Sequence, residues 1–340
     1  MKTTIYKTIW TVRNFLLEAI EKKEKIFLTY ISRPSNSNYF ETQKTVTISP
    51  RCGIVLQGQL LKDRDFTLET IRIYKKIFPE AEIIVSTWKD EDQELIEKIK
   101  KEKVNILLND KPKYGGGTWQ PNVNLQIVSS FSGIKMAKKL GCEYVLKTRT
   151  DQRIYNSNTL RLFYNLTEKF PIATSHNQKK RIVGVSLNTF TYRMYGLSDM
   201  NVFGSIDDMM LFWGVDLDNR RGYDIKDISL REFAHLQVCE VYFVTEFLKK
   251  IGRNLKWTLR DSWEVFAEHL CIVDQQTIGL YWHKYEKHNE YRHPQYYCEK
   301  TDKEMNFSEW LEIYSNLQNL KINENILDLR FGEKTSIASL

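Results

Sequence analysis

The chain has 340 residues, of which 42% are hydrophobic, so it is long enough for one large α/β domain or two modest ones. Its 8 Trp, 18 Tyr and 17 Phe argue against a disordered chain and for a folded core with binding surfaces. The formal net charge of +7 is a mild excess spread along the chain, which suits an anionic small molecule or membrane surface. Nucleic-acid binding, which usually shows a concentrated basic stripe, is not expected.

The cysteines and the lack of long apolar runs bear on the cellular compartment. The cysteines are odd in number and form no Cys-x-x-Cys pair; they are Cys52, Cys142, Cys239, Cys271 and Cys298. This pattern favours buried thiols in a reducing compartment. The N-terminus does not resemble a signal peptide, and no apolar run reaches the ~20 residues that span a bilayer. We therefore expect a cytoplasmic protein, or one that lies peripherally on the inner face of a membrane.

The N-terminal residues 1–45 are predicted to form a helix followed by a polar loop. Apolar side chains recur there at helical spacing, at Ile5, Ile9, Val12, Leu16, Ala19 and Ile20. Such a helix can pack on the domain or lie on a membrane. Because Glu18, Glu21 and Glu24 dilute its basic face, we expect it to pack on the domain.

Residues 46–298 are predicted to form a single α/β domain. Apolar residues at helical spacing alternate there with short apolar runs, which predict strands at 53–58, 82–88, 104–108 and 144–147. Continuous apolar strands in this order are typical of a parallel sheet covered by helices on both faces. Gly115-Gly116-Gly117 lacks the ending of a phosphate-binding loop and is interpreted as a flexible loop, with Pro121 in the first turn of the next helix.

The later part of the chain continues the alternation less regularly. Residues 181–190 and 278–285 are strand-like, and Asp199 is expected to follow a strand. Helices are predicted to begin near Asp207 and at Glu240. The last segment, 299–340, is predicted to be a polar C-terminal extension with one helix at about 310–317.

The stretch that follows the fourth strand carries the most chemistry. Asp151 lies among three cations there, Lys147, Arg149 and Arg153. Ligands of open α/β sheets bind just beyond the carboxyl ends of the strands, so this cluster suits a diphosphate, with or without a metal ion. The alternative is a strand end whose charges meet water. Strand alternation would place Lys147, Arg149 and Asp151 on one side.

An ordered series of motifs resembles the WavE lipopolysaccharide-synthesis family. The series runs through Gly53-Ile-Val-Leu-Gln-Gly58, Phe78-Pro79, Ile83-Ile-Val-Ser-Thr-Trp88, Asn124, Gln126-Ile127, Leu146-Lys-Thr-Arg-Thr-Asp151, Ser198-Asp199, Gly204 to Met209, Glu240 and Lys284-Tyr285. It covers most of residues 50 to 290. The resemblance implies a GT-A-like fold, that of nucleotide-diphospho-sugar transferases. The chain departs from the pattern at Leu125, where the family resemblance leads us to expect Arg before Gln126.

The resemblance implies a glycosyltransferase that moves a sugar from a nucleotide-sugar donor to a saccharide or lipid-linked saccharide acceptor. The product would be a bacterial surface polysaccharide, either lipopolysaccharide or capsule. The donor-binding candidates are Gln57, Gly58, Ser86, Trp88, Asn124, Gln126, Lys147, Arg149, Asp151, Arg153 and Lys284. Trp88 can stack on a base or sugar, or be a core aromatic at the rim of the sheet.

The sequence does not decide how the charge of a leaving diphosphate is neutralised, or which group removes the proton of the acceptor. Asp151 and His283 are candidate ligands of Mg²⁺ or Mn²⁺, but Arg149 and its neighbouring cations could neutralise a diphosphate directly. Glu240 and Asp199 are the candidate general bases, which an inverting transfer needs and a retaining one does not. Asp207 and Asp208 are better explained as charges at a helix N-terminus.

Two further functions remain compatible with the sequence. A sugar nucleotidyltransferase usually has a Gly-rich, basic loop after the first strand, of which the segment 58–64 is a poor version. A glycan- or nucleotide-binding scaffold without activity would fit the single acidic residue at the end of the fourth strand.

Overall fold

The computed structural model describes residues 2–25, 27–28, 31–42, 50–112, 122–173, 176–220, 226–286 and 303–331. Three features of the sequence interpretation therefore lie outside the described residues: the Gly115-Gly116-Gly117 loop, Pro121 and Cys298. Of the other cysteines, Cys52, Cys142 and Cys271 are buried free thiols, as expected, and Cys239 is partly exposed.

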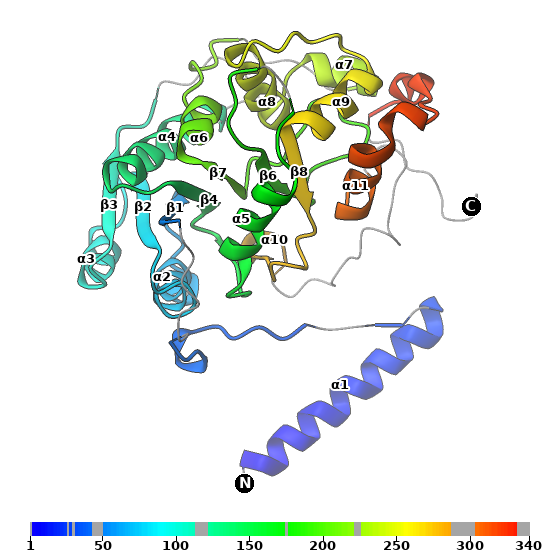
Figure 1. Ribbon diagram of the computed structural model, residues 1–340. Helices are drawn as coiled ribbons and strands as arrows, with labels where there is room; N and C mark the ends of the chain where they lie inside the picture. The colour runs from blue at the N-terminus through cyan, green and yellow to red at the C-terminus, as the bar shows by residue number, and fades with distance from the viewer. Residues whose placement is uncertain are drawn as a thin grey trace.

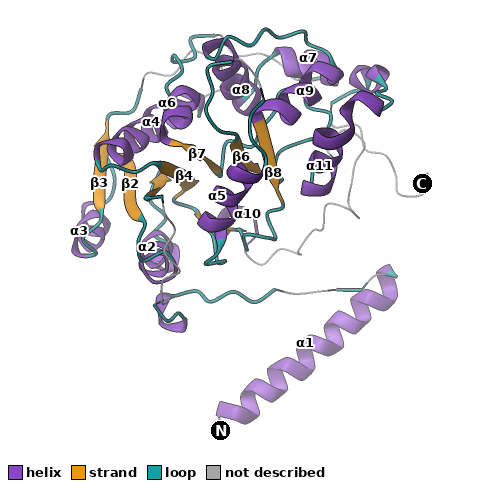
Figure 2. Ribbon diagram, in the orientation of Figure 1, coloured by secondary structure: helices purple, strands orange, loops and turns teal. Residues whose placement is uncertain are grey.

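A seven-stranded sheet organises the described part of the chain (Figure 2). In spatial order its strands are β3 (Asn105–Asn109), β2 (Glu82–Trp88), β1 (Cys52–Gln57), β4 (Tyr144–Arg149), β7 (Val202–Ser205), β6 (Ile182–Val185) and β8 (Leu270–Val273). The first four are mutually parallel, β7 runs antiparallel to β4 and β6, and β6 is parallel to β8. The predicted fold class, an α/β fold with a mostly parallel sheet, is confirmed.

Helices cover both faces of this sheet (Figure 1). They are α2 (Phe66–Ile77), α3 (Gln93–Lys101), α4 (Val123–Lys139), α5 (Thr159–Lys169), α6 (Ile206–Trp213), α7 (Leu230–His235), α8 (Cys239–Lys250), α9 (Leu259–His269) and α11 (Phe307–Asn316). Helix α4 packs closely on β1, because a Cβ added at Gly133 would lie 2.3 Å from Val55 Cγ1. As predicted, Asp207 and Asp208 lie in the first turn of a helix, α6.

A second, two-stranded sheet brings distant residues to the carboxyl end of β4. Strand β5 (Gln152–Arg153) pairs antiparallel with β9 (Tyr281–Trp282), and the short helix α10 (His283–Glu286) follows at once. The strand predicted at 278–285 is thus much shorter than expected. The reason is that residues 275–279 form turns and the backbone becomes helical at His283, whose N–H donates to the Asp151 carbonyl at 3.1 Å.

The N-terminal helix α1 (Lys2–Glu24) does not pack on the domain as the sequence suggested. It lies apart from the sheet and its helices (Figure 1), and Trp10 and Phe15 are 54% and 71% exposed. The following segment, 31–42, is tied to α2, since the Ser37 N–H donates to the Glu69 carboxylate at 2.7 Å. No helix among the described residues is long and apolar enough to cross a membrane.

The C-terminal segment belongs to the folded core. Trp310 of α11 is fully buried and its indole N–H donates to the carbonyls of Phe266 and Leu270, at 3.0 Å each. Helix α11 therefore completes the packing on β8 and α9.

Asp199 also differs from expectation, because it lies in irregular chain before β7 and does not follow a strand.

Candidate active site

The end of β4 carries a closely paired cation and carboxylate. Arg149 donates to both oxygens of Asp151, from Nε at 2.8 Å and from Nη2 at 3.0 Å. The Trp282 indole N–H donates to the same carboxylate at 3.1 Å. The Arg149 side chain is 27% exposed, and its Nη1 has no hydrogen bond to the described residues. Asp151 thus fixes the guanidinium and leaves one edge of it available to a ligand.

The Asp151 carboxylate is ionised at neutral pH. Burial acts to raise its pKa, but the hydrogen bonds and charge of Arg149 and the bond from Trp282 outweigh it, so the pKa of Asp151 lies below its ordinary value. The Asp151 carboxylate therefore orients the Arg149 guanidinium and is not suited to donate a proton.

A second contact lies at the same edge of the sheet, between Asp63 and His283, and was not predicted from the sequence. Asp63, at the start of the 3₁₀ turn Asp63–Asp65 that follows β1, lies with Oδ2 2.7 Å from His283 Nε2. The ring of Phe66 lies 4.7 Å from the His283 ring. Because 220 positions separate Asp63 from His283, no local pattern could have indicated this pair.

The predicted metal ligands Asp151 and His283 do not form a metal centre. Both oxygens of Asp151 are held by Arg149, and His283 Nε2 faces Asp63. Within the described ranges, no group of three or more His, Cys, Asp or Glu side chains is arranged to hold a metal ion. The donor set here suits a fixed cation better than a divalent metal.

Lys147 lies beneath this edge and is fully buried. Its ammonium donates to the Asp199 carbonyl and to Gln126 Oε1, and lies 4.6 Å from the centre of the Trp213 ring. Burial lowers the pKa of Lys147 to about 7, against the opposing effect of the Asp199 carboxylate. Lys147 therefore supports the residues around Asp199 from below and is not exposed to a donor.

Asp199, beside Lys147, and Glu240 are near enough for their charges to interact. Gln126 donates from Nε2 to the Asp199 carboxylate, which is buried. Glu240, in the first turn of α8, remains 17% exposed and lies 3.7 Å from the Arg193 guanidinium. Burial, and then the charge of Asp199, raise the pKa of Glu240, while Arg193 acts in the opposite direction. Glu240 and Asp199 stay predicted candidates for the base, and Arg193, which lies in irregular chain beside Glu240, was not singled out from the sequence.

Several predicted donor-binding residues are buried under the strand ends. Gln57 accepts a hydrogen bond from the Ser129 hydroxyl at 2.7 Å, and the Ser86 hydroxyl donates to the Ser129 carbonyl at 2.6 Å. Trp88 is only 4% exposed, which favours the core aromatic over the stacking platform. Gly58 remains partly exposed at the edge itself, with φ of 111°, a conformation that glycine adopts readily.

Arg153 and Asn124, both predicted to bind the donor, have their hydrogen-bonding groups engaged within the fold. Arg153 is 1% exposed and donates to the carbonyls and hydroxyls of Pro34, Ser35, Phe66, Thr70 and Tyr155. These bonds fasten the N-terminal segment to α2. Asn124 is buried and pairs through its amide with the main chain of Asp218, at 3.0 and 2.7 Å. By contrast, Lys284 is exposed, with its ammonium 4.9 Å from the Tyr285 ring.

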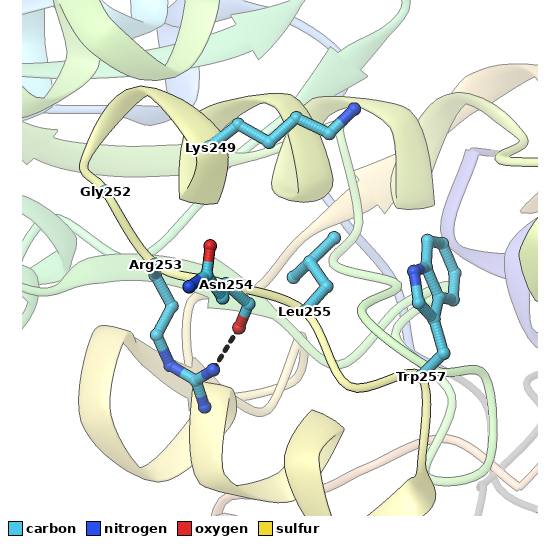
Figure 3. Close-up of a pocket in the computed structure, with 6 residues that line it drawn as sticks. All are labelled: Lys249, Gly252, Arg253, Asn254, Leu255 and Trp257. Atoms are coloured by element: carbon cyan, nitrogen blue, oxygen red, sulfur yellow. Dashed lines mark hydrogen bonds between the residues drawn. The ribbon is translucent and has the colours of Figure 1, made fainter.

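A shallow cavity of about 320 Å³ lies elsewhere, at the C-terminal end of α8 (Figure 3). It is lined by Lys249, Gly252, Arg253, Asn254, Leu255 and Trp257. Glu240 lies near the opposite end of α8, about 15 Å away at 1.5 Å per residue. None of the predicted site residues lines this cavity, so it is separate from the charged edge of the sheet.

The sheet, with helices on both faces and a charged carboxyl edge, defines an α/β protein with a mostly parallel sheet (Figure 1). The chain belongs to the family described as WavE lipopolysaccharide synthesis, whose model matches residues 53–337. A search of curated proteins gives no match.

Three solved structures show distant likeness. A cytidylyltransferase from Leptospira borgpetersenii is 12% identical, with a TM-score of 0.29 over 50% of this chain and 66% of that chain, so just under two thirds of its length is spanned. A 4-diphosphocytidyl-2C-methyl-D-erythritol synthase from Anaerococcus prevotii is 12% identical, with a TM-score of 0.37 over 66% of this chain and 88% of that one. Core-mannan synthase A from Aspergillus fumigatus is 8% identical, with a TM-score of 0.35 over 75% of this chain and 82% of that one. These likenesses are too distant to transfer an activity.

Proposed function

We propose that the chain is a glycosyltransferase that moves a sugar from a nucleotide-sugar to a saccharide acceptor in bacterial surface-polysaccharide synthesis. Family membership supports the biological setting. The observation that carries the chemistry is the partly exposed Arg149, held by Asp151 at the carboxyl end of a parallel strand. A planar guanidinium with free donors is suited to a diphosphate, which it can bind through two parallel hydrogen bonds.

The proposed reaction needs charge compensation on one side and proton removal on the other. The bond between the anomeric carbon and the diphosphate oxygen breaks, and the nucleoside diphosphate leaves with the electron pair. Arg149 stabilises the charge that develops on this leaving group. The acceptor hydroxyl oxygen forms the new bond to the anomeric carbon and gives its proton to Glu240.

Glu240 is preferred over Asp199 as the base. Its side chain is partly exposed, whereas Asp199 is buried and already accepts a hydrogen bond from Gln126. A raised pKa also makes the Glu240 carboxylate a stronger base, provided that it stays ionised at the working pH. This role belongs to an inverting transfer; a retaining transfer would proceed without it.

The proposal assigns no step to a divalent metal, since the donor set around Asp151 does not fit one. Lys147, Gln126 and Asp199 act as positioning residues below the reacting groups. The proposed donor is a nucleotide-sugar and the proposed acceptor a saccharide, free or lipid-linked. The proposed location is the cytoplasm or the cytoplasmic face of the inner membrane.

The first test is a thermal-shift screen of the full chain with nucleoside diphosphates and nucleotide-sugars. A ligand that binds only the native state raises its apparent stability, by about 2.7 kcal/mol at a concentration of 100 Kd. We expect one nucleoside diphosphate to raise the Tm, and Arg149→Gln to abolish that rise without lowering the Tm of the free protein by more than a few degrees. Release of pyrophosphate from a nucleoside triphosphate and a sugar phosphate would instead assign the chain to the nucleotidyltransferases. If none of the nucleoside diphosphates or nucleotide-sugars binds, the interpretation as a scaffold without activity is favoured.

A further inference from the structure

The cavity at the C-terminal end of α8 contains polar groups that are available to a ligand. Within the described residues, neither the indole N–H of Trp257 nor the side-chain amide of Asn254 forms a hydrogen bond. Trp257 is partly exposed and Asn254 is exposed. Figure 3 shows the indole nitrogen on the side of its ring that faces Leu255, which also lines the cavity. The cavity therefore offers a ligand one N–H donor and one amide that can both donate and accept.

Two cations line the cavity, and carboxylates of the protein pair with both of them. Arg253 is only 8% exposed; its guanidinium donates to the Asp261 carboxylate at 2.7 Å and lies 3.5 Å from that of Glu268. The Lys249 ammonium donates to the Glu246 carboxylate at 2.6 Å. An anionic ligand would have to compete with these carboxylates for the cations. The charge distribution therefore favours a neutral ligand.

Trp257 is held in a backbone conformation that bulky residues rarely adopt. Its φ is 54°, in the left-handed region, and residues strained in this way are concentrated at functional sites. The Trp257 main-chain N–H donates to the Tyr195 hydroxyl at 2.9 Å. The His235 ring stacks on the indole, with 4.2 Å between the ring centres and 25° between the planes. These contacts fix the indole before a ligand binds, which lowers the entropic cost of binding.

Two parts of the chain connect the cavity with the candidate base Glu240. Tyr195, which holds Trp257, lies two residues after Arg193, whose guanidinium is 3.7 Å from the Glu240 carboxylate. Helix α8 is the second connection, because Glu240 lies in its first turn and Lys249 lies near its end. The nine positions between these two residues correspond to about 14 Å at 1.5 Å per residue. The cavity thus lies within reach of an extended ligand that also contacts Glu240.

We propose that this cavity is a subsite for a neutral saccharide and that it holds a sugar ring of the acceptor at a distance from the bond that forms. A pyranose carries hydroxyls around its rim and apolar C–H groups on its faces. These match the free amide, the indole N–H and the apolar surface of Leu255 and Trp257. The volume of about 320 Å³ lies at the lower end of small-molecule sites and suits a short saccharide. Saccharide binding depends on the cavity alone, whereas its assignment to the acceptor rests on the proposed transfer.

The test is a titration of the full chain, without nucleotide, with lactose, maltotriose and neutral fragments of bacterial surface polysaccharides, followed by saturation-transfer NMR. We expect at least one saccharide to bind. Trp257→Phe combined with Asn254→Ala should weaken that binding by about tenfold or more, because two hydrogen-bonding groups are lost. Phe keeps an aromatic ring against His235, so the double variant should fold, which thermal unfolding checks. The matched control is Trp10→Ala, which removes an exposed tryptophan of α1 and should leave binding unchanged.

Three results would overturn the subsite. The first is the absence of binding by every saccharide, and the second is binding that is unchanged in the folded double variant. The third is binding of inorganic pyrophosphate that Lys249→Gln abolishes, since an anion would then occupy the cavity.

The assignment to the acceptor has a separate readout. In the transfer assay, the double variant should raise the KM for the acceptor by about tenfold and leave the KM for the donor unchanged. An unchanged KM for the acceptor would reject that assignment. Saccharide binding by a chain that releases no nucleoside diphosphate from any nucleotide-sugar would support the subsite and reject the proposed transfer, so the two failures are distinguishable.

Discussion

The pair between Asp151 and Arg149 predicts the effect of Asp151→Asn. The amide keeps the shape of the side chain and can still accept a hydrogen bond, but it removes the negative charge that fixes Arg149. Removing one partner of a fully buried ion pair costs about 3–5 kcal/mol. The side chains of Arg149 and Asp151 are 27% and 14% exposed, so water compensates in part. We therefore expect a loss of about 2 kcal/mol in unfolding free energy at pH 7.

The pH dependence of that loss follows from the direction of the pKa shift. Because the folded-state pKa of Asp151 is depressed, the pair contributes its full stability above the ordinary Asp pKa of about 3.9. That contribution disappears as the pH falls through the lower folded-state value, where the carboxylate takes up a proton. The difference between the unmodified chain and Asp151→Asn should thus be constant from pH 6 to 7 and shrink below about pH 4.

The same substitution should affect turnover more strongly than stability. A guanidinium that is no longer oriented loses most of its transition-state contact, which is worth about 10²–10³ in kcat. The assay is nucleoside diphosphate release at saturating donor, with urea unfolding of the same preparations. Asp207→Asn is the matched control, since Asp207 pairs on the surface with Lys138 and Lys179 and should change neither quantity. A folded Asp151→Asn variant with unchanged kcat would refute the assignment of Arg149 to the leaving group.

Four further outcomes are expected. Glu240→Gln should lower kcat by about 10²–10⁴ and remove the acidic limb of its pH profile, whose midpoint should lie above the ordinary Glu pKa because the pKa of Glu240 is raised. Lys147→Met should flatten the rise of unfolding free energy between about pH 7 and pH 10, where the unfolded chain binds a proton that the folded one does not, at up to about 1.4 kcal/mol per pH unit. Turnover should survive EDTA, because the groups around Asp151 do not form a metal site; activity lost to EDTA and restored by Mn²⁺ would contradict this. Gly133→Ala should cost about 1–3 kcal/mol in urea unfolding, because its Cβ would overlap Val55.

Most of the first half of the sheet could be predicted because strands β1, β2 and β4 are buried on both faces. A buried parallel strand is a continuous apolar run, as in Ile83 to Val85 of β2, and turn residues mark its ends. The strands predicted at 82–88 and 104–108 lie within one residue of β2 and β3. Local composition was therefore sufficient to predict these two strands.

Residues with long-range partners could not be placed in this way. Arg153 resembles a phosphate ligand in sequence, and only the packing of residues 34 and 35 against α2 shows that its donors are used within the protein. The contact of Asp63 with His283, and that of Trp282 with Asp151, depend on the pairing of β5 with β9. Sequence periodicity carries no information on such pairings, so Asp63 was missed and His283 was assigned a metal.

Helix α1 shows a related limit. Its periodicity correctly predicts a helix, but periodicity does not say what covers the apolar face. The acidic residues Glu18, Glu21 and Glu24 led to the expectation of packing, which the position of α1 apart from the sheet does not bear out (Figure 1).

The proposed transfer is tested most directly by following both products of one reaction. The unmodified chain is incubated with the nucleotide-sugar that its nucleoside diphosphate preference selects and with a panel of saccharide acceptors. We predict that one acceptor gains a single sugar in mass spectrometry, with equimolar nucleoside diphosphate, and that Arg149→Gln forms neither product at a detectable rate. Acceptor extension that proceeds unchanged in Arg149→Gln, or the release of pyrophosphate in place of nucleoside diphosphate, would contradict the proposed site and reaction.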